Sequence, residues 1–374
     1  MFVQGFLLID VDGAALNNAG VVSRSGVGNT VETKKIYKEG GCYPYASGEA
    51  WGNWWRTSLG KNAGWNLSPL TYDKGNRIAY TAADPFKYGD DDIFGYMKAI
   101  PGEGNEPLTR ISPLKTSIIG SVCNVRVAKN FCVMARQNDV PAPYGKEEYS
   151  AVMKGMFSLD IEQVGTFSKY YRAGYKNITE AMFEQHEQEC TVIEDKFTLA
   201  KDGGKEKLIR IDDETRLKRI TDTIKALKYI SGGAMQTNNM VDVTPKFIVL
   251  AKTKYGNHPF SHIVFADPIR KEQSIFDVAK FVNTINDNAE LFDGDIYIGR
   301  RDGFWEEYDE LLTAMASGSN CSDEDVSNKF NDENDKTNKR KANIKSLVNI
   351  HYGPVNKIID DFCSSIKLEK DEIL

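Results

Sequence analysis

An apolar segment at the start of the chain limits what the rest can fold into. Residues 2–11 (FVQGFLLIDV) are almost uniformly apolar and end at a DG turn signal. A short apolar run bounded by turn residues is typical of a buried strand. We therefore expect a buried first strand, which the remaining elements must cover.

Two later segments have the pattern of amphipathic helices. In YASGEAWGNWWRTSLG, Ser47 can cap a helix that turns its tryptophans inward. In DDETRLKRITDTIKALKYI, Asp212 or Asp213 can cap a helix with cations on much of its polar side. The apolar face of this second helix comprises Leu217, Ile220, Ile224 and Leu227, and the helix stops at Gly232 and Gly233.

Two short strands are expected after these helices. KFIVLAK and SHIVFAD are separated by TKYGNHPF, which predicts a hairpin with a Gly-Asn turn. The order is then strand, helix, long middle section, strand, helix and paired strands. This order predicts an α+β protein with a modified RNA-recognition (ferredoxin-like) fold and large insertions.

The composition indicates a globular protein with free thiols. The 374 residues, 41% of them hydrophobic, can bury a large core in two or three lobes. The six cysteines lie far apart with no CxxC pair, so no disulfide framework is expected. No apolar run approaches the roughly 20 residues that span a bilayer, and the start lacks signal-peptide features, so we expect a cytoplasmic protein with no membrane partner.

Charges are unevenly distributed along the chain. The formal net charge is -6, yet residues 109–138 contain five cations and no acid, whereas acids gather at Asp90–Asp92 and after Ser322. A basic groove can bind nucleic acid on an acidic protein, because affinity depends on the local field. The acid-free stretch is therefore a candidate nucleic-acid contact, and the alternative is a basic exposed hairpin without a ligand.

Signatures of enzymes and metal sites are scarce. His258 and His262 have the spacing of two metal ligands on a helix, but Pro259 opposes a helix and no third ligand is evident. The GxG at 26–28 lacks the context of a dinucleotide site, and the DVDG at 10–13 lacks the later ligands of a calcium loop. We expect no metal, no cofactor and no catalytic residue.

Five motifs, in order, carry a resemblance to a known family. They are GFLLIDVDGAALNNAG, YPYASGEAWGNWWRTSL, LTRISPLKTSIIGSV, FSLDIEQVGTF and SGGAMQTNNMVDVTPKFIVLA. Together they resemble the Cas-seven family of CRISPR-associated proteins, and within it the DevR-like branch of type I-B systems. The resemblance runs from the first residue to about Asp267 and implies a hand-shaped fold with a palm, fingers and a thumb.

The resemblance also implies how the chain is divided. The expected parts are an RNA-recognition-type palm (1–60 and 151–316), a fingers-like insertion (61–107), a basic thumb-like excursion (108–150), a polar mobile segment (317–340) and a C-terminal helical segment (341–374). The polar segment is nearly free of large apolar residues, which is typical of a solvated linker.

The family's role implies contacts with the RNA backbone. Arg and Lys would hold phosphates while bases stay free to pair, so few base-specific donors are needed. Asn17 and Asn18 could instead form turns, Arg56 could pair with Glu49, and Gly232 could simply cap a helix. The residues expected to bind RNA are Asn17, Asn18, Arg24, Lys34, Lys35, Arg56, Arg110, Lys115, Ser117, Arg126, Lys129, Arg136, Gly232, Gly233 and Gln236.

The resemblance predicts a non-catalytic backbone subunit of the Cascade surveillance complex. Copies would stack head to tail along a CRISPR guide RNA, beside other Cascade subunits, and present its bases to target DNA. Related subunits that cut RNA use an aspartate after the first strand, whereas residues 17–35 here hold Glu32 as their only acid.

Two other functions stay open. The DevR name implies an autoregulator, so the chain could bind operator DNA, although no helix-turn-helix signature is evident. An RNA-processing endonuclease of similar fold would need a catalytic histidine beside a glycine-rich loop, and none of the four histidines has that context.

Overall fold

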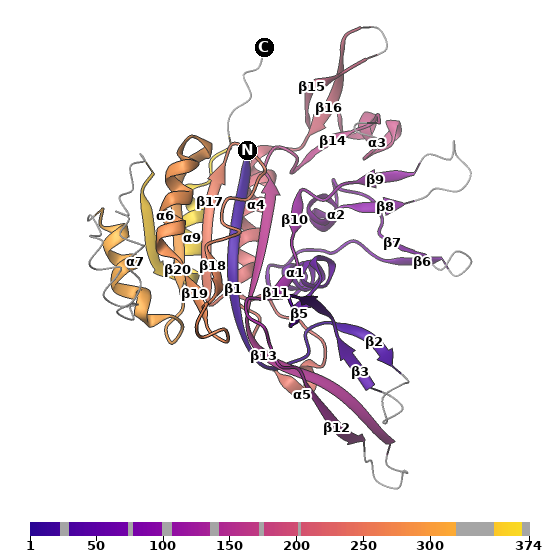
Figure 1. Cartoon of the computed structure of the whole chain (residues 1–374). Coiled ribbons are helices and arrows are strands. Elements are labelled where there is room, and N and C mark those ends of the chain that lie inside the picture. The colour runs from indigo at the N-terminus through magenta and orange to yellow at the C-terminus, as the bar shows by residue number, and fades with distance from the viewer. Residues whose placement is uncertain are drawn as a thin grey trace.

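The fold is α+β and is built on one large mixed sheet (Figure 1). The computed structural model describes residues 1–22, 30–73, 78–98, 107–134, 142–171, 176–200, 203–318 and 348–368. The main path of the sheet has the strand order β21-β20-β17-β1-β13-β11-β5-β4. None of the described helices is long and apolar enough to cross a membrane.

A ferredoxin-like unit lies at the centre of this sheet. In chain order it comprises β1 (Phe2–Ala14), α1 (Gly48–Asn62), β11 (Ile119–Ser121), β13 (Ala142–Asp160), α4 (Asp213–Lys225) and β17 (Phe247–Thr253). These elements give the order β-α-β-β-α-β that defines the class. The first strand lies between β13 and β17, antiparallel to both. The predicted fold class is therefore confirmed.

Other elements extend the sheet or cover it. On the edges and faces of the main sheet lie β4 (Lys35–Lys38), β5 (Gly41–Ala46), β10 (Leu114–Thr116), β20 (Phe292–Arg300), β21 (Ile350–Pro354), α6 (Val278–Asp287), α7 (Asp309–Ala316) and α9 (Val355–Ser365). Away from its main path lie β2 (Asn18–Val22), β3 (Thr30–Thr33), β6 (Thr71–Asp73), β7 (Ile78–Tyr80), α2 (Gly89–Phe94), β8 (Tyr96–Lys98), β9 (Leu108–Arg110), β12 (Ala128–Met134), β14 (Thr166–Ser168), α3 (Glu180–His186), β15 (Thr191–Leu199), β16 (Lys205–Arg210), α5 (Gln236–Asn239), β18 (Val264–Ala266) and β19 (Ser274–Phe276). Short 3-10 turns cover 226–228, 289–291 and 306–308.

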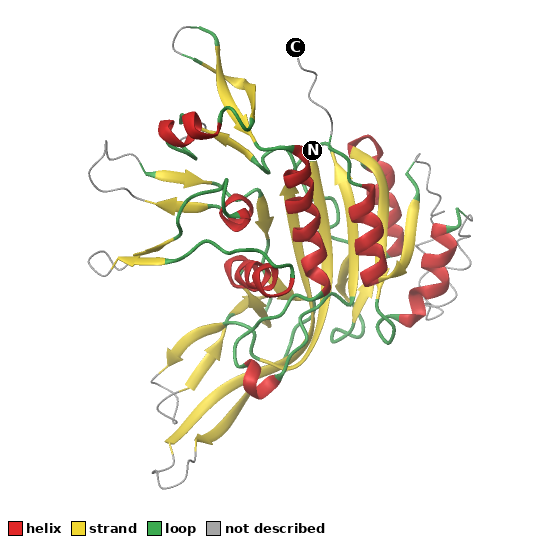
Figure 2. Cartoon of the chain, turned by 180° about the vertical axis from the view of Figure 1, so that it is seen from behind, coloured by secondary structure: helices red, strands yellow, loops and turns green. Residues whose placement is uncertain are grey.

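Two apolar cores cover the sheet on opposite faces. One core joins α1, α4 and α9 to odd-numbered residues of β1, and Figure 2 shows α4 and α9 side by side on that face. The other core joins α6 and α7 to Phe6 and Leu8 of the same strand. Because both cores use β1, Phe6, Leu7, Leu8 and Ile9 are at most 2% exposed, and the predicted buried first strand is confirmed.

The two predicted helix starts are also confirmed. The Ser47 hydroxyl accepts a hydrogen bond from the backbone N–H of Ala50 at 3.3 Å. Trp51 and Trp55, on the inner side of α1, are fully buried. The Asp212 carboxylate accepts from the N–H of Thr215 at 2.8 Å and begins α4. In each case the side chain satisfies a backbone donor that the first helical turn leaves unpaired.

Hairpins project from one side of this core (Figure 1). They are β2–β3, β6–β7, β8–β9, β12–β13 and β15–β16. The strand β13 is 19 residues long: its first half pairs with β12 in the hairpin and its second half pairs with β1 in the main sheet. The expected division at residue 150 therefore falls inside one continuous strand.

The prediction of a hairpin between residues 246 and 267 is wrong. β17 pairs with β1 and β20, whereas β18 pairs with β19 in a separate two-stranded sheet. The connecting residues do not make a tight turn, because Phe260 and Ile263 are fully buried in the core beside α6.

The C-terminal segment 341–374, expected to be helical, also contains a strand, β21. β21 joins the main sheet parallel to β20 before α9 begins. Of the predicted polar segment 317–340, all but residues 317 and 318 lie outside the described residues.

Candidate nucleic-acid interface

The end of β1, the start of α1 and the glycine-rich loop at residues 231–236 meet in space. Asn17 accepts a hydrogen bond from the N–H of Ser47 at 3.1 Å through its side chain and from the N–H of Lys34 at 2.8 Å through its carbonyl. The N–H of Ala234 donates to the carbonyl of Leu16 at 2.9 Å. Residues far apart in the sequence, which the resemblance groups as RNA contacts, are thus neighbours around the end of β1.

The glycine-rich loop is shaped by packing against α1. A Cβ added at Gly232 would overlap the indole ring of Trp54, so only glycine fits there. Gly233 has a φ of +108°, a region that residues with a Cβ rarely adopt. Gln236 closes the loop: its amide donates to the carbonyl of Gly232 and accepts from the N–H of Val241. These contacts hold the loop beside the end of β1 without any ligand.

Two of the predicted RNA contacts, Lys35 and Lys129, are paired with the buried carboxylate of Glu147. Glu147 of β13 is 1% exposed and lies 2.5 Å from the ammonium of Lys35 and 3.5 Å from that of Lys129. Burial alone would raise the pKa of Glu147, but the hydrogen bonds from Lys35 and Thr33 outweigh burial and hold this pKa below its usual range. Lys129 also contacts Glu32 at 3.4 Å and keeps 59% of its side chain exposed.

The remaining predicted contacts are scattered. Lys115 of β10 and Arg126, in the loop after β11, are exposed. Ser117 is used internally, because its hydroxyl accepts from the N–H of Met156 and its carbonyl accepts from the indole of Trp51.

One further predicted residue lies on the β2–β3 hairpin. Asn18 is exposed at the start of β2, opposite Thr33 of β3. Arg24 and Arg136 lie outside the described residues.

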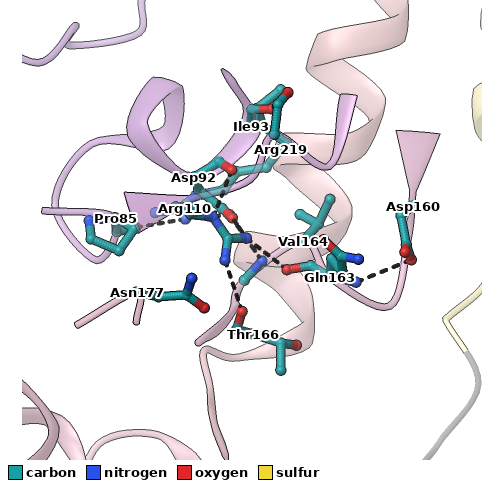
Figure 3. A network of polar contacts seen from close by, with 12 residues as sticks. Pro85, Asp92, Ile93, Arg110, Asp160, Gln163, Val164, Thr166, Asn177 and Arg219 are labelled. Atoms are coloured by element: carbon teal, nitrogen blue, oxygen red, sulfur yellow. Dashed lines mark hydrogen bonds and ion pairs between the residues drawn. The ribbon is translucent and has the colours of Figure 1, made fainter. Parts of the chain in front are cut away.

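Arg110 cannot hold RNA as predicted, because it is buried inside the protein (Figure 3). Its guanidinium donates to the carbonyls of Asp92, Thr166 and Gln163 at 2.8, 3.0 and 2.7 Å, and it forms an ion pair with the Asp92 carboxylate. The same group lies over the ring of Phe167, 4.6 Å from its centre. These contacts occupy the guanidinium, so Arg110 joins β9 to the segments that hold Asp92, Gln163 and Thr166.

Arg219 of α4 belongs to the same network and corrects the predicted polar face of that helix. It is buried and donates to the Asp92 carboxylate at 2.7 Å and to the carbonyls of Pro85 and Phe86. Arg216, one turn earlier, is also buried. These two cations therefore bind protein groups rather than solvent.

Arg56 also forms its contacts within the protein, but its partner is not Glu49. It donates to the buried carboxylate of Asp90 at 2.7 Å and to the carbonyl of Ser68 at 3.2 Å, instead of pairing with Glu49. The Asp90–Asp92 cluster, where acids gather in the sequence, thus supplies the buried counter-charges of three arginines. No local sequence signal distinguishes such a cluster from a surface run.

The fold and these contacts define an α+β protein with a ferredoxin-like core, projecting hairpins and exposed cations near them. The family model described as CRISPR-associated negative auto-regulator DevR/Csa2 matches residues 9–273. The chain therefore belongs to this family of CRISPR-associated proteins, as its motifs predict.

Similar chains also occur among the solved structures. Two similar chains are described as "CRISPR RNA-guided surveillance complex" and "CRISPR RNA-guided surveillance complex, pre-nicking". Their identities to this chain are 11% and 10%, each with a TM-score of 0.49, and each alignment covers 97% of this chain and 99% of the other. The comparison with curated proteins finds no match.

Proposed function

We propose that this protein is a non-catalytic backbone subunit of a type I-B Cascade complex in the cytoplasm. It binds the phosphates and sugars of a CRISPR guide RNA, stacks head to tail with further copies, and presents the guide's bases to target DNA beside other Cascade subunits. The observation that carries this proposal is the DevR/Csa2 match over residues 9–273, which includes the motifs gathered around the end of β1.

The charges near the hairpins support a backbone contact. Arg126 and Lys129 are exposed, and Lys129 lies at 3.4–3.5 Å from two carboxylates, a separation at which a phosphate can compete for it. Such contacts depend on the sugar-phosphate chain rather than on base edges.

The absence of RNA cutting is also part of the proposal. Glu32 lies on β3 with its carboxylate paired to Lys129, which favours a role in charge balance. Guide RNA, complementary RNA and Mg²⁺ mixed with the protein should give no periodic cleavage. Cleavage that Glu32→Ala abolishes would overturn this part.

Salt-dependent binding tests the RNA contact. The variant Arg126→Ala/Lys129→Ala should bind unrelated guide sequences more weakly and to a similar extent. The slope of log affinity against log salt should fall by about 1.4, since each phosphate contact on a single strand contributes about 0.7. Unchanged affinity and slope would place the RNA elsewhere.

The family description favours one alternative, because it names a negative auto-regulator. In that case the protein would bind duplex DNA from its own operon. A titration with single-stranded RNA and operator duplex under matched salt separates the two functions. Tighter binding to the duplex would favour the autoregulator.

A further inference from the structure

A group of lysines and tyrosines lies on the face of the sheet opposite α1. Lys154 of β13 is paired in register with Gly120 of β11, and Gly120 is paired with Tyr45 of β5. Cross-strand partners point to the same face, and alternate residues of a strand share it. Tyr43 therefore lies on this face too, and so does Lys38 of β4, which is paired with Gly41.

The face is identified by its neighbours. Met153 and Ile119 pack in the core under α1, so Lys154 and Gly120, the next residues along their strands, point the other way. Lys115 is paired with Ser158 of β13, four residues beyond Lys154, and lies on the same side. The predicted contact Lys115 thus belongs to this face, away from the contacts at the end of β1.

Lys154 has no anionic partner among the described residues. Its ammonium donates only to the carbonyls of Ser261 and Val264, at 3.3 and 3.4 Å, and no described carboxylate lies within 4.0 Å of it. Burial lowers the pKa of Lys154, and the charge of Lys38 lowers it further. A partly buried cation that faces a second cation is unfavourable unless an anion joins them.

The surface around the two lysines is partly apolar. The atoms nearest to a Cβ built on Gly120 belong to the side chains of Ile118 and Tyr45, at 3.4 to 3.9 Å, so an added methyl group would make only ordinary contacts with them. Tyr43 and Tyr45 are half-buried and Ile36, opposite Tyr43, is 43% exposed. Cations beside accessible aromatic rings suit the phosphates and bases of a single strand. An acidic peptide would use the lysines and leave the rings without a role.

We propose that Lys38, Lys154, Tyr43 and Tyr45 form a second binding surface for single-stranded nucleic acid, on the opposite face of the sheet from the guide contacts at the end of β1. The two lysines hold one phosphate of the strand between them. The tyrosines offer stacking surfaces to the neighbouring bases, and Lys115 extends the basic track along β13.

Binding measurements on matched variants test this surface. Labelled oligouridine and the matching oligodeoxyuridine are titrated with wild-type protein, Lys38→Ala, Lys154→Met and Tyr45→Ala. The control is Lys357→Ala, which removes an exposed lysine of α9 with the same change in charge. Each lysine variant should lower the salt slope by about 0.7, and Tyr45→Ala should weaken binding at least about fivefold. The control should match wild type.

Photo-crosslinking gives a second readout that does not depend on the variants. Oligomers containing 5-iodouridine or 5-iododeoxyuridine should crosslink to the peptide that holds Tyr43 and Tyr45, and comparison of the two identifies RNA or DNA as the preferred strand. If Lys154→Met fails to fold, the salt slope of the exposed Lys38→Ala variant tests the proposal instead. Slopes equal to that of the control, or crosslinks of the oligomers only to peptides that lack Tyr43 and Tyr45, would overturn the proposal.

The outcome also separates this proposal from the proposed function. Wild-type protein that binds guide RNA while Lys38→Ala and Lys154→Met behave like Lys357→Ala would overturn only the second surface. Wild-type protein that binds no single strand would overturn both.

Discussion

Asp92 shows how a single buried carboxylate can join segments that are far apart in the sequence. It is fully buried, and both Arg110 and Arg219 donate to it, so three segments of the chain meet at one charge. The N–H of Gly165 also donates to it at 2.9 Å. Such a site is satisfied only when all its partners are present, because each buried group has lost its water.

Removing this carboxylate should destabilise the fold strongly. Asp92→Ala leaves two buried guanidinium groups without their counter-charge, and we expect a loss of about 3–5 kcal/mol in the free energy of unfolding. Urea denaturation measures it, with Lys115→Ala as the exposed control, which should change stability by less than about 1 kcal/mol. Equal effects of the two substitutions would contradict the assignment of Asp92.

His258 gives a pH dependence whose sign follows from its contacts. Its Nε2 lies 3.0 Å from the carbonyl of Gly5, while its Nδ1 accepts from the N–H of Phe260 at 3.3 Å, which requires the neutral ring. Burial lowers the pKa of His258 from 6.5 to about 4. The unfolded chain therefore binds the proton first as pH falls.

The stabilising contribution of neutral His258 should be complete above pH 6.5 and lost as pH falls toward 4. The shift corresponds to about 3 kcal/mol. In denaturation curves from pH 7 to pH 4, His258→Gln should lose less stability than wild type. Parallel curves for the two proteins would show that His258 titrates normally.

Residue-level prediction from sequence failed where burial decided the role. Arg110 and Lys115 lie five positions apart in the same acid-free stretch, yet one is buried against Asp92 and the other is exposed on β10. Both are cations in the same acid-free stretch, so local charge offers no way to separate them. Their roles depend on which distant residues the fold brings close.

At the scale of elements, the segments that carry their own start signals were predictable. α1 and α4 begin at side chains that cap them, and most residues of β1 are apolar, so local chemistry was sufficient. The segment 254–263 was not, because its role is to cover the sheet with Phe260 and Ile263 rather than to form the turn that Gly-Asn suggests. Tertiary packing overrode the local turn signal there.

The contact between the glycine-rich loop and α1 can be tested with two glycines. Gly232→Ala forces a methyl group into Trp54 and should destabilise the protein by about 1–3 kcal/mol. Gly52→Ala, on α1 with nothing within 4 Å of the added carbon, should instead stabilise it by about 0.5–1 kcal/mol. Thermal unfolding compares them, and a neutral Gly232→Ala would mean that the loop moves away easily.

At the scale of the whole molecule, the net charge and the position of the cations have opposite effects on assembly. A formal net charge of -6 makes copies repel one another, whereas Arg126 and Lys129 remain exposed near the hairpins. An RNA chain is a linear array of phosphates, so it can bridge successive copies that do not associate alone. A heterologous contact between copies propagates along such an array rather than closing into a ring of two.

RNA should therefore control the size of the assembly. Without RNA we expect monomers, and with single-stranded RNA we expect multimers whose mass rises in steps as the RNA is lengthened, because each added site raises the effective concentration of the next copy. Sedimentation velocity over a series of RNA lengths measures this, and raising the salt concentration should shift each step back toward monomer as counterions compete for the cations. The Lys357→Ala protein should behave as wild type, and Arg126→Ala/Lys129→Ala should need longer RNA for the same mass. A closed dimer whose mass ignores RNA length and salt would mean that protein contacts alone set the assembly, and that these cations serve another purpose.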